Sequence, residues 1–122
     1  MKIRIKGNSI RLRLGRSEVT SLCDQGLLLE TTQFPSGDFF DYSIILECVD
    51  DVQAFILENG IQVAIPEELG RSWAGTDEVG ISTALDLPEG GQLSVLIEKD
   101  FQCMKARVDE DESDLYPNPA AG

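Results

Sequence analysis

The chain has 122 residues, of which 42% are hydrophobic, and its formal net charge is −12. This length fits one domain with its own core, and the composition is typical of a globular protein rather than a disordered one. The acidic balance excludes a general nucleic-acid-binding surface. No apolar run approaches the roughly 20 residues of a membrane-spanning helix. The N-terminus alternates charged with apolar residues, unlike a signal peptide.

The chain contains no histidine. It therefore lacks the commonest general base and the commonest transition-metal ligand, and Ser–His and Cys–His nucleophiles are excluded. Cys23, Cys48 and Cys103 are widely spaced and odd in number, so neither a zinc site nor a disulfide framework is indicated. Free thiols suit a reducing compartment, and we expect a cytoplasmic protein without a cofactor.

The charges are unevenly distributed along the chain. Six of the ten basic residues fall in the first sixteen positions, where no acid occurs: Lys2, Arg4, Lys6, Arg11, Arg13 and Arg16. The remaining 106 residues hold 22 acids and four bases, a local net charge of −18. The sequence thus joins a basic N-terminal segment to an acidic body.

The basic segment has the pattern of a β-hairpin. Residues 2–6 and 9–14 alternate with period two, as half-buried strands do, and Gly7-Asn8 between them suits a type II′ turn. A short helix is expected next, with Ser17 as its N-cap and Gly26 as its C-terminal stop.

Six further strands and a second short helix are expected after the first helix. Pro66-Glu67-Glu68 is typical of a first helical turn, and Asn59-Gly60 is a strong hairpin signal. The strands are expected in residues 27–34, 39–48, 52–57, 61–65, 79–86 and 93–101. No internal repeat is found in the sequence. We expect a mainly β protein (a β-rich α+β fold) of about eight antiparallel strands in a small barrel or sandwich, with two short helices.

We predict a single globular domain over residues 1–107 and an acidic, flexible C-terminal tail over residues 108–122. The tail begins like a calcium loop, but Asp114 and Ala120 occupy the positions where an EF-hand needs glycine and glutamate. A solvated acidic run is the simpler interpretation. The tail could instead dock on a basic partner or on the basic hairpin, in the same molecule or in a homodimer.

The hairpin carries the candidate site. Its register pairs Arg4 with Arg11 and Lys2 with Arg13 on one face, and like charges opposite one another cost roughly 0.2–1 kcal/mol per pair. One source of compensation is a neighbouring strand with carboxylates; Glu98 and Asp100 lie two apart on one strand face, and Glu47 is another option. The other source is an anionic ligand, because Arg binds oxyanions bidentately. The candidate anion-binding residues are Lys2, Arg4, Arg11 and Arg13.

Two further residues have a structural and a functional interpretation. Cys103 lies near Lys99 and Lys105, and nearby cations favour the thiolate, but without histidine an ordinary thiol is the better interpretation. Trp73, in the second helix, is expected to be a packing anchor rather than a stacking platform.

The opening KIRIKGNSIRLRL, followed by SEV, and the closing IEKDFQCMKAR and DESDLYPNP resemble a family of small uncharacterised bacterial proteins. The similarity spans most of the chain. The family has no assigned activity, so the resemblance implies a bacterial origin and one intact domain, and it transfers no functional residue.

A weaker, fold-level comparison is with triphosphate tunnel metalloenzymes, eight-stranded antiparallel barrels with inward-pointing Lys and Arg. Their alternating Glu-x-Glu-x-Lys signature is absent here, where Lys2, Arg4 and Lys6 occupy the corresponding strand. The chain is also short for that fold.

The leading functional prediction is a non-catalytic cytoplasmic binding module that uses the basic hairpin. Its partner would be an acidic protein or a phosphate-bearing small molecule, with no nucleic acid and no membrane involved. The alternative is a small metal-dependent phosphohydrolase of the tunnel-barrel type, in which Glu98 and Asp100 would hold the metal. Metal chemistry would require these carboxylates to converge on one site.

Overall fold

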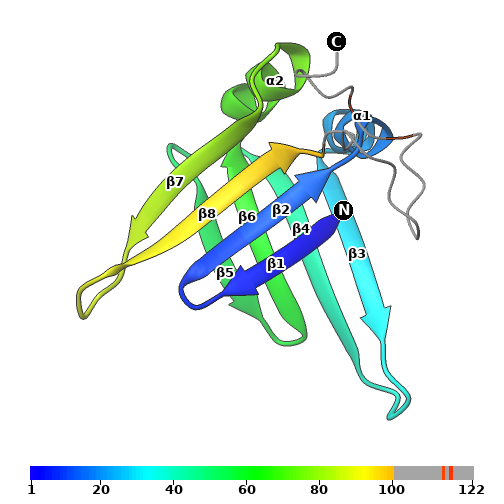
Figure 1. Cartoon of the computed structure of the whole chain (residues 1–122), viewed down its shortest axis with the longest axis vertical. Helices are drawn as coiled ribbons and strands as arrows, with labels where there is room; N and C mark the ends of the chain where they lie inside the picture. Colours follow the sequence, from blue (N-terminus) through cyan, green and yellow to red (C-terminus); the bar gives the residue numbers. More distant parts are fainter. Residues whose placement is uncertain (101–113, 115, 117–122) are drawn as a thin grey trace, which may run out of the picture. The chain divides into compact units, whose positions relative to one another are not determined.

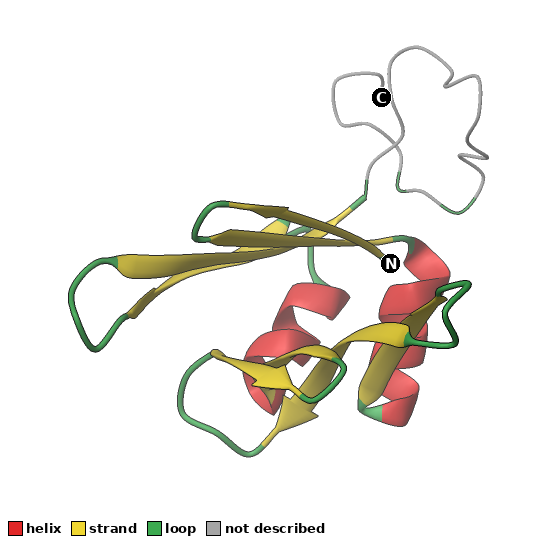
Figure 2. Cartoon of the chain, turned by 90° about the horizontal axis from the view of Figure 1, so that it is seen from below, coloured by secondary structure: helices red, strands yellow, loops and turns green. Residues whose placement is uncertain are grey.

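A computed structural model describes residues 1–100, 114 and 116. In these residues strands predominate, with two short helices between them (Figures 1 and 2). The elements in chain order are β1 (Lys2–Lys6), β2 (Ser9–Leu14), α1 (Arg16–Gln25), β3 (Leu27–Gln33), β4 (Phe39–Glu47), β5 (Gln53–Leu57), β6 (Gly60–Pro66), α2 (Glu67–Gly75), β7 (Gly80–Asp86) and β8 (Gln92–Lys99). The predicted mainly β fold, with eight strands and two helices, is confirmed. Neither described helix has the length and apolar character needed to cross a membrane.

The chain divides into two compact units. Unit 1 comprises Met1–Val19 and Val79–Gly122, and unit 2 comprises Thr20–Glu78. Unit 1 contains sheet A, in the order β1-β2-β8-β7, and unit 2 contains sheet B, in the order β3-β4-β6-β5. Over the described residues each sheet is open, so the strands form no closed barrel. The single domain over residues 1–107 stays a prediction, and the tail over residues 108–122, except Asp114 and Tyr116, lies outside the described residues.

The centre of each sheet differs from the prediction of antiparallel strands. The four hairpins pair antiparallel as expected, but β2 runs parallel to β8 and β4 runs parallel to β6. The alternation of a strand reports its buried face and not the direction of its neighbour. Direction is set by how two distant hairpins meet, and the sequence pattern does not contain this information.

The two sheets have the same topology, because the chain contains two copies of one structural repeat. The first repeat is β1-β2-α1-β3-β4 and the second is β5-β6-α2-β7-β8. Sheet A takes the first hairpin of the first repeat and the second hairpin of the second repeat, and sheet B takes the other two hairpins. The pairing of Ser9 with Ser94 in sheet A corresponds to that of Gly60 with Asp41 in sheet B.

Local hydrogen bonds follow the repeat closely. The carbonyl oxygen of Asn8 accepts a bond of 2.9 Å from the amide of Ser94, and that of Asn59 accepts one of 2.8 Å from the amide of Asp41. The five-residue hairpin loops match as well, with Gly37 at φ 94° and Gly90 at φ 97°. The sequence interpretation that found no repeat is therefore wrong. Few side chains are shared between equivalent positions, among them Asn8 with Asn59 and Gly37 with Gly90, so the repeat is clear in the backbone but not in the sequence.

The first helix begins before its expected cap. The amide of Gly15 donates to Oε1 of Glu18 at 2.9 Å, and its carbonyl accepts the first helical bond, from Val19. Gly15 is thus the N-cap and Glu18 closes the turn, as in a capping box. Ser17 lies inside the helix and donates through Oγ to Oδ2 of Asp114 at 2.7 Å. The expected stop is confirmed: Gly26 has φ 75°, which favours glycine.

Both units contain buried hydrophobic side chains. In unit 1 the buried hydrophobic side chains are Ile10, Leu12, Leu14, Val19, Ile81, Val95 and Ile97. In unit 2 they are Leu22, Ile44, Val52, Val63, Ala64, Ile65 and Trp73. The predicted packing role of Trp73 is consistent with its complete burial. In unit 2, Gly70 of α2 approaches Leu46 and Ile65, so α2 packs on that face of sheet B.

The close approach of β4 to Gly60 predicts that Gly60→Ala is much less stable than Gly75→Ala. A Cβ atom at this position would lie 1.8 Å from the carbonyl oxygen of Asp41, a backbone atom of the parallel neighbour β4. Gly60→Ala is therefore expected to destabilise the protein by about 3 kcal/mol or more, because the strands must separate. Gly75→Ala is the matched control, since a Cβ there meets nothing within 4 Å. Urea denaturation measures both; equal stability of the two variants would contradict the β4–β6 register.

Tyr42 gives a prediction for alkaline pH. Burial, and then the negative charge of Glu30 opposite it on β3, raise the pKa of Tyr42 above 10.0. The stabilisation from this shift is fully present below pH 10.0 and is lost as the pH rises through the raised value. Glu30→Gln should lower the Tyr42 midpoint toward its ordinary value. Phenolate absorbance in a Tyr116→Phe background measures it, and an unchanged midpoint would rule out the contribution of Glu30.

Candidate functional site

The predicted register of the basic hairpin is confirmed. Lys2 lies opposite Arg13 and Arg4 opposite Arg11, and Gly7 has φ 52°, as the first position of a type II′ turn requires. The hairpin alternation places these four side chains on one face of sheet A. Strand β8 then completes the site, because its Glu98 is the parallel partner of Arg13.

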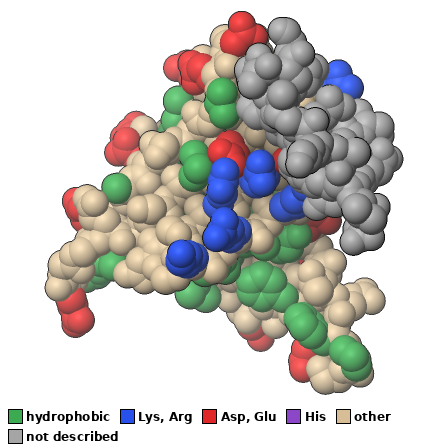
Figure 3. Space-filling view, in the orientation of Figure 1, with side chains coloured by type: hydrophobic (Ala, Val, Ile, Leu, Met, Phe, Trp, Pro, Cys, Tyr) green, Lys and Arg blue, Asp and Glu red, His purple; other side chains and the backbone are tan. Residues whose placement is uncertain are grey.

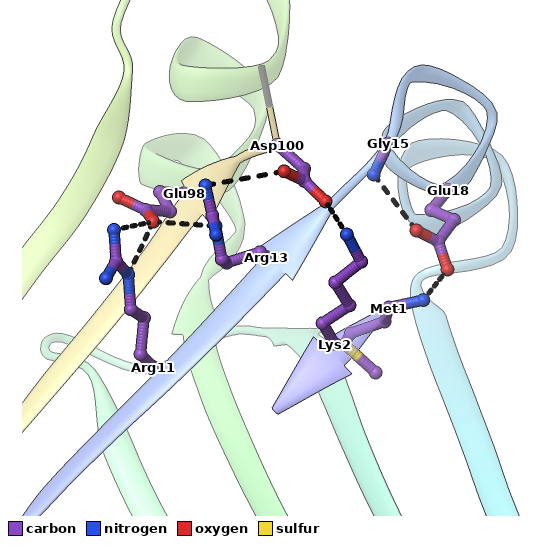
Figure 4. A network of polar contacts seen from close by, with 8 residues as sticks. All are labelled: Met1, Lys2, Arg11, Arg13, Gly15, Glu18, Glu98 and Asp100. Carbon is purple, nitrogen blue, oxygen red and sulfur yellow. Dashed lines mark hydrogen bonds and ion pairs between the residues drawn. The ribbon is translucent and has the colours of Figure 1, made fainter. Parts of the chain in front are cut away.

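Glu98 joins two arginines of β2 (Figure 4). Its Oε1 atom lies 2.5 Å from both Nε and Nη2 of Arg11 and 3.1 Å from Nε of Arg13. The two guanidinium groups project two residues apart along β2, and the carboxylate lies between them. A single acid therefore offsets the repulsion between neighbouring cations.

Asp100 joins the same arginine to the edge strand (Figure 4). Its Oδ2 atom lies 2.8 Å from Nζ of Lys2, and its Oδ1 atom lies 3.4 Å from Nη2 of Arg13. The backbone amide of Asp100 donates to the carbonyl of Leu14 at 2.8 Å, which extends the parallel β2–β8 ladder by one residue. We call Lys2, Arg11, Arg13, Glu98 and Asp100 the cation network.

The network is a buried acidic layer under more exposed cations. The side chains of Asp100 and Glu98 are 2% and 11% exposed, whereas those of Lys2, Arg11 and Arg13 are between 32% and 46% exposed. Buried carboxylates need partners, because an unpaired buried charge is costly. The heads of the cations thus cover the acids and still reach solvent. Lys99 lies between Glu98 and Asp100 in the sequence, and its Nζ atom is 5.5 Å from the ring centre of Tyr116.

Cations gather on this face of unit 1. The space-filling view shows Lys and Arg side chains in one group, with acidic atoms beside them (Figure 3). Arg4 and Lys6 are exposed on the edge strand β1. The three cations of the network outnumber its two carboxylates, and Arg4, opposite Arg11, adds a fourth cation to the same face.

A second contact anchors the start of β1 and was not predicted from the sequence. The N-terminal ammonium of Met1 pairs with Oε2 of Glu18, the residue that also caps α1 (Figure 4). The signal for the cap was present, as a glutamate three residues into a helix. The pairing of Glu18 with the ammonium of Met1 depends on how β1 lies relative to α1. The sequence pattern does not contain this information.

The other sequence-predicted residues that the structure describes are not members of the cation network. Glu47, the other acid considered for compensation, belongs to β4 of sheet B and pairs in register with Pro66. Cys23 and Cys48 are free thiols. Cys103, with the cations proposed to lower its pKa, and the calcium-like run of the tail lie outside the described residues.

The described residues offer little to a metal ion. Within residues 1–100, 114 and 116 no group of three or more His, Cys, Asp or Glu side chains is arranged to hold one. Glu98 and Asp100, the ligands of the metal hypothesis, do lie on one face, but they contact three cations. Positive neighbours oppose the binding of a divalent cation, and their heads occupy the carboxylate oxygens it would need.

The internal repeat tests whether the fold itself requires this network. By the matching registers, Arg11 and Arg13 correspond to Gln62 and Ala64 in sheet B, and Glu98 corresponds to Ile45. Sheet B thus builds the same three-strand arrangement without any of these charges. The cation network is a property of sheet A and not of the topology.

The comparisons place the chain in a family without assigning a role. A family of unknown function (DUF7009) matches residues 1–120, and the chain belongs to it. No curated protein and no solved structure matches the chain. The resemblance to a family of uncharacterised proteins is confirmed.

The repeat makes a prediction about stability. Glu98→Gln removes the charge that separates Arg11 from Arg13, and we expect it to cost about 2 kcal/mol, less at high salt. The triple variant Arg11→Gln/Arg13→Ala/Glu98→Ile copies the side chains of sheet B and should unfold within about 1 kcal/mol of the native chain, because Glu98 is removed together with both of its arginines and Asp100, which loses Arg13, keeps Lys2. Denaturant unfolding compares the two. A triple variant less stable than Glu98→Gln would show that the fold depends on the network.

Proposed function

Since the chain belongs to a family of unknown function, we propose from its geometry that it is a non-catalytic binding module of the bacterial cytoplasm. It recognises an anionic group, carried by an acidic protein or by a phosphate-bearing small molecule. The contact residues are Arg4, Lys2, Arg11 and Arg13 on the basic face of sheet A.

One observation carries the proposal: the fold does without these charges in sheet B, yet sheet A gathers them on one face. Holding like charges together costs free energy that an apolar or neutral face would avoid. Glu98 and Asp100 fix the guanidinium and ammonium groups from below and leave their outer sides accessible. Preorganised cations of this kind lose little side-chain entropy when they bind an oxyanion.

The proposal assigns different tasks to the two arginines of the register pair. Arg11 is held by Glu98, so we assign it a contact with the anion from a fixed position. Arg4 lies opposite Arg11 on an exposed edge strand, so it is the side chain best placed to contact a ligand first. The free thiols of Cys23 and Cys48 suit the reducing compartment in the proposal.

Thermal unfolding at low salt tests the proposal, with inorganic triphosphate and a polyglutamate peptide as probes. A probe that binds only the folded chain adds about 2.7 kcal/mol at 100 times its dissociation constant. We expect one of the probes to raise the unfolding temperature and Arg4→Ala to weaken its binding about tenfold.

Arg71→Ala is the matched control, because it removes the same charge from an exposed side chain of unit 2, where Arg71 pairs with Glu67 and donates to the carbonyl of Cys23. A stabilisation that Arg4→Ala and Arg71→Ala reduce equally would mean non-specific attraction and would refute the site. Binding of triphosphate would indicate a phosphate-bearing small molecule, and binding of polyglutamate would indicate an acidic protein. Unfolding temperatures that neither probe changes would refute the proposal as a whole.

A further inference from the structure

We propose that the outer edge of β5 is a docking site for an extended segment of a partner protein in which basic and apolar residues alternate. The segment would add a strand to sheet B beside β5. This site belongs to unit 2 and is independent of the proposed anion site on sheet A.

The first argument is the open backbone of β5. Among the described residues, β5 pairs with β6 only and ends the sheet. The two-residue turn makes Leu57 and Gly60 a hydrogen-bonded pair, so the amides of Ala54 and Ile56 point away from β6. Such outward groups are a template for an added strand, the recognition mode known as β-augmentation.

The second argument is the exposure of its side chains. Phe55, Ile56 and Leu57 are 43%, 88% and 46% exposed, and the strand QAFIL contains no charge, no proline and no bulge. Edge strands are normally protected by such features, above all by lysine. An exposed apolar edge without protection favours association.

The internal repeat sharpens this contrast. Strand β1 occupies the equivalent edge of sheet A, where Lys2, Arg4 and Lys6 stand at the positions of Gln53, Phe55 and Leu57. One edge of the repeat is thus charged in the way that blocks strand addition, and its equivalent is apolar. The topology itself does not require β5 to be apolar.

The negative charge of unit 2 indicates which kind of segment would bind at β5. Residues 20–78, which form unit 2, contain twelve acids and one base, Arg71, a formal net charge of −11. Asp50 and Asp51 precede β5, and Glu58 follows it directly. A strand with lysine or arginine at alternate positions would match the acids at both ends, while its apolar side chains would cover Phe55 and Leu57.

The same acids disfavour a second copy of the chain. Antiparallel β5–β5 pairing about Phe55 would bring Glu58 of each copy close to Asp51 of the other, between molecules of net charge −12. Like charges at both ends of a short strand pair oppose the apolar gain. A cationic segment meets no such repulsion.

The test uses the full chain and a labelled peptide of alternating Lys and Val, with an alternating Glu and Val peptide as its counterpart. Fluorescence anisotropy should show binding of the Lys peptide only, weaker at high salt. Phe55→Lys should weaken it at least about tenfold. Ser82→Lys adds the same charge to the exposed edge strand β7 of sheet A and should leave the affinity unchanged.

Amide hydrogen exchange in the native chain locates the contact and does not depend on whether the variants fold. Bound Lys peptide should protect the amides of Ala54 and Ile56. Protection at β1 instead, or equal loss of affinity in Phe55→Lys and Ser82→Lys, would overturn the proposal, as would failure of the Lys peptide to bind. Sedimentation that shows dimers of the native chain, abolished by Phe55→Lys, would assign the edge to a second copy and also overturn it.

Discussion

The parallel pairing of β2 with β8 is the interaction on which the rest of unit 1 depends. It joins two hairpins from opposite ends of the chain, so that Arg11 and Glu98, 87 positions apart, come within hydrogen-bonding distance. Closing so long a loop costs conformational entropy, and the buried apolar residues of the two strands, such as Leu12 and Ile97, repay it. Without this ladder the basic hairpin would lack both the core beneath it and the acids beside it.

The internal repeat separates what the fold requires from what one copy has added. Positions that agree between the copies serve the backbone: Asn8 and Asn59 bind the neighbouring parallel strand, and Gly37 and Gly90 adopt the same turn conformation. Other positions differ in chemistry between the copies; the buried Glu98 of sheet A, for example, corresponds to Ile45 of sheet B. A side chain that differs between two copies of one topology is free of the demands of that topology. Its chemistry must then be explained by stability at that place or by function.

The sequence predicted elements and local register well, and tertiary pairing poorly. Period-two alternation and Gly7-Asn8 were sufficient for the basic hairpin, because two-residue turns fix the register of their strands. The compensation of Arg11 and Arg13 by Glu98 and Asp100 was one of two alternatives, and only the position of β8 distinguished them. The parallel direction, the repeat and the cap at Gly15 were missed. The parallel direction and the repeat depend on contacts between segments far apart in the sequence, as does the contact of Asp114 with α1. The cap is local, between Gly15 and Glu18, and its signal was overlooked.

The two proposed surfaces occupy equivalent edges of the repeat, and this gives them a common physical logic. An edge strand must either repel or accept another strand. The lysines and arginine of β1 give that edge charges that hinder strand addition. In the proposed function Lys2 and Arg4 of this strand would also bind the anion. The apolar β5 lacks that protection, and in the proposed interaction the acids of unit 2 would favour a strand of the opposite charge. Electrostatics therefore supplies at β5 the selectivity that its side chains alone would not provide, by excluding acidic chains, further copies of this one included.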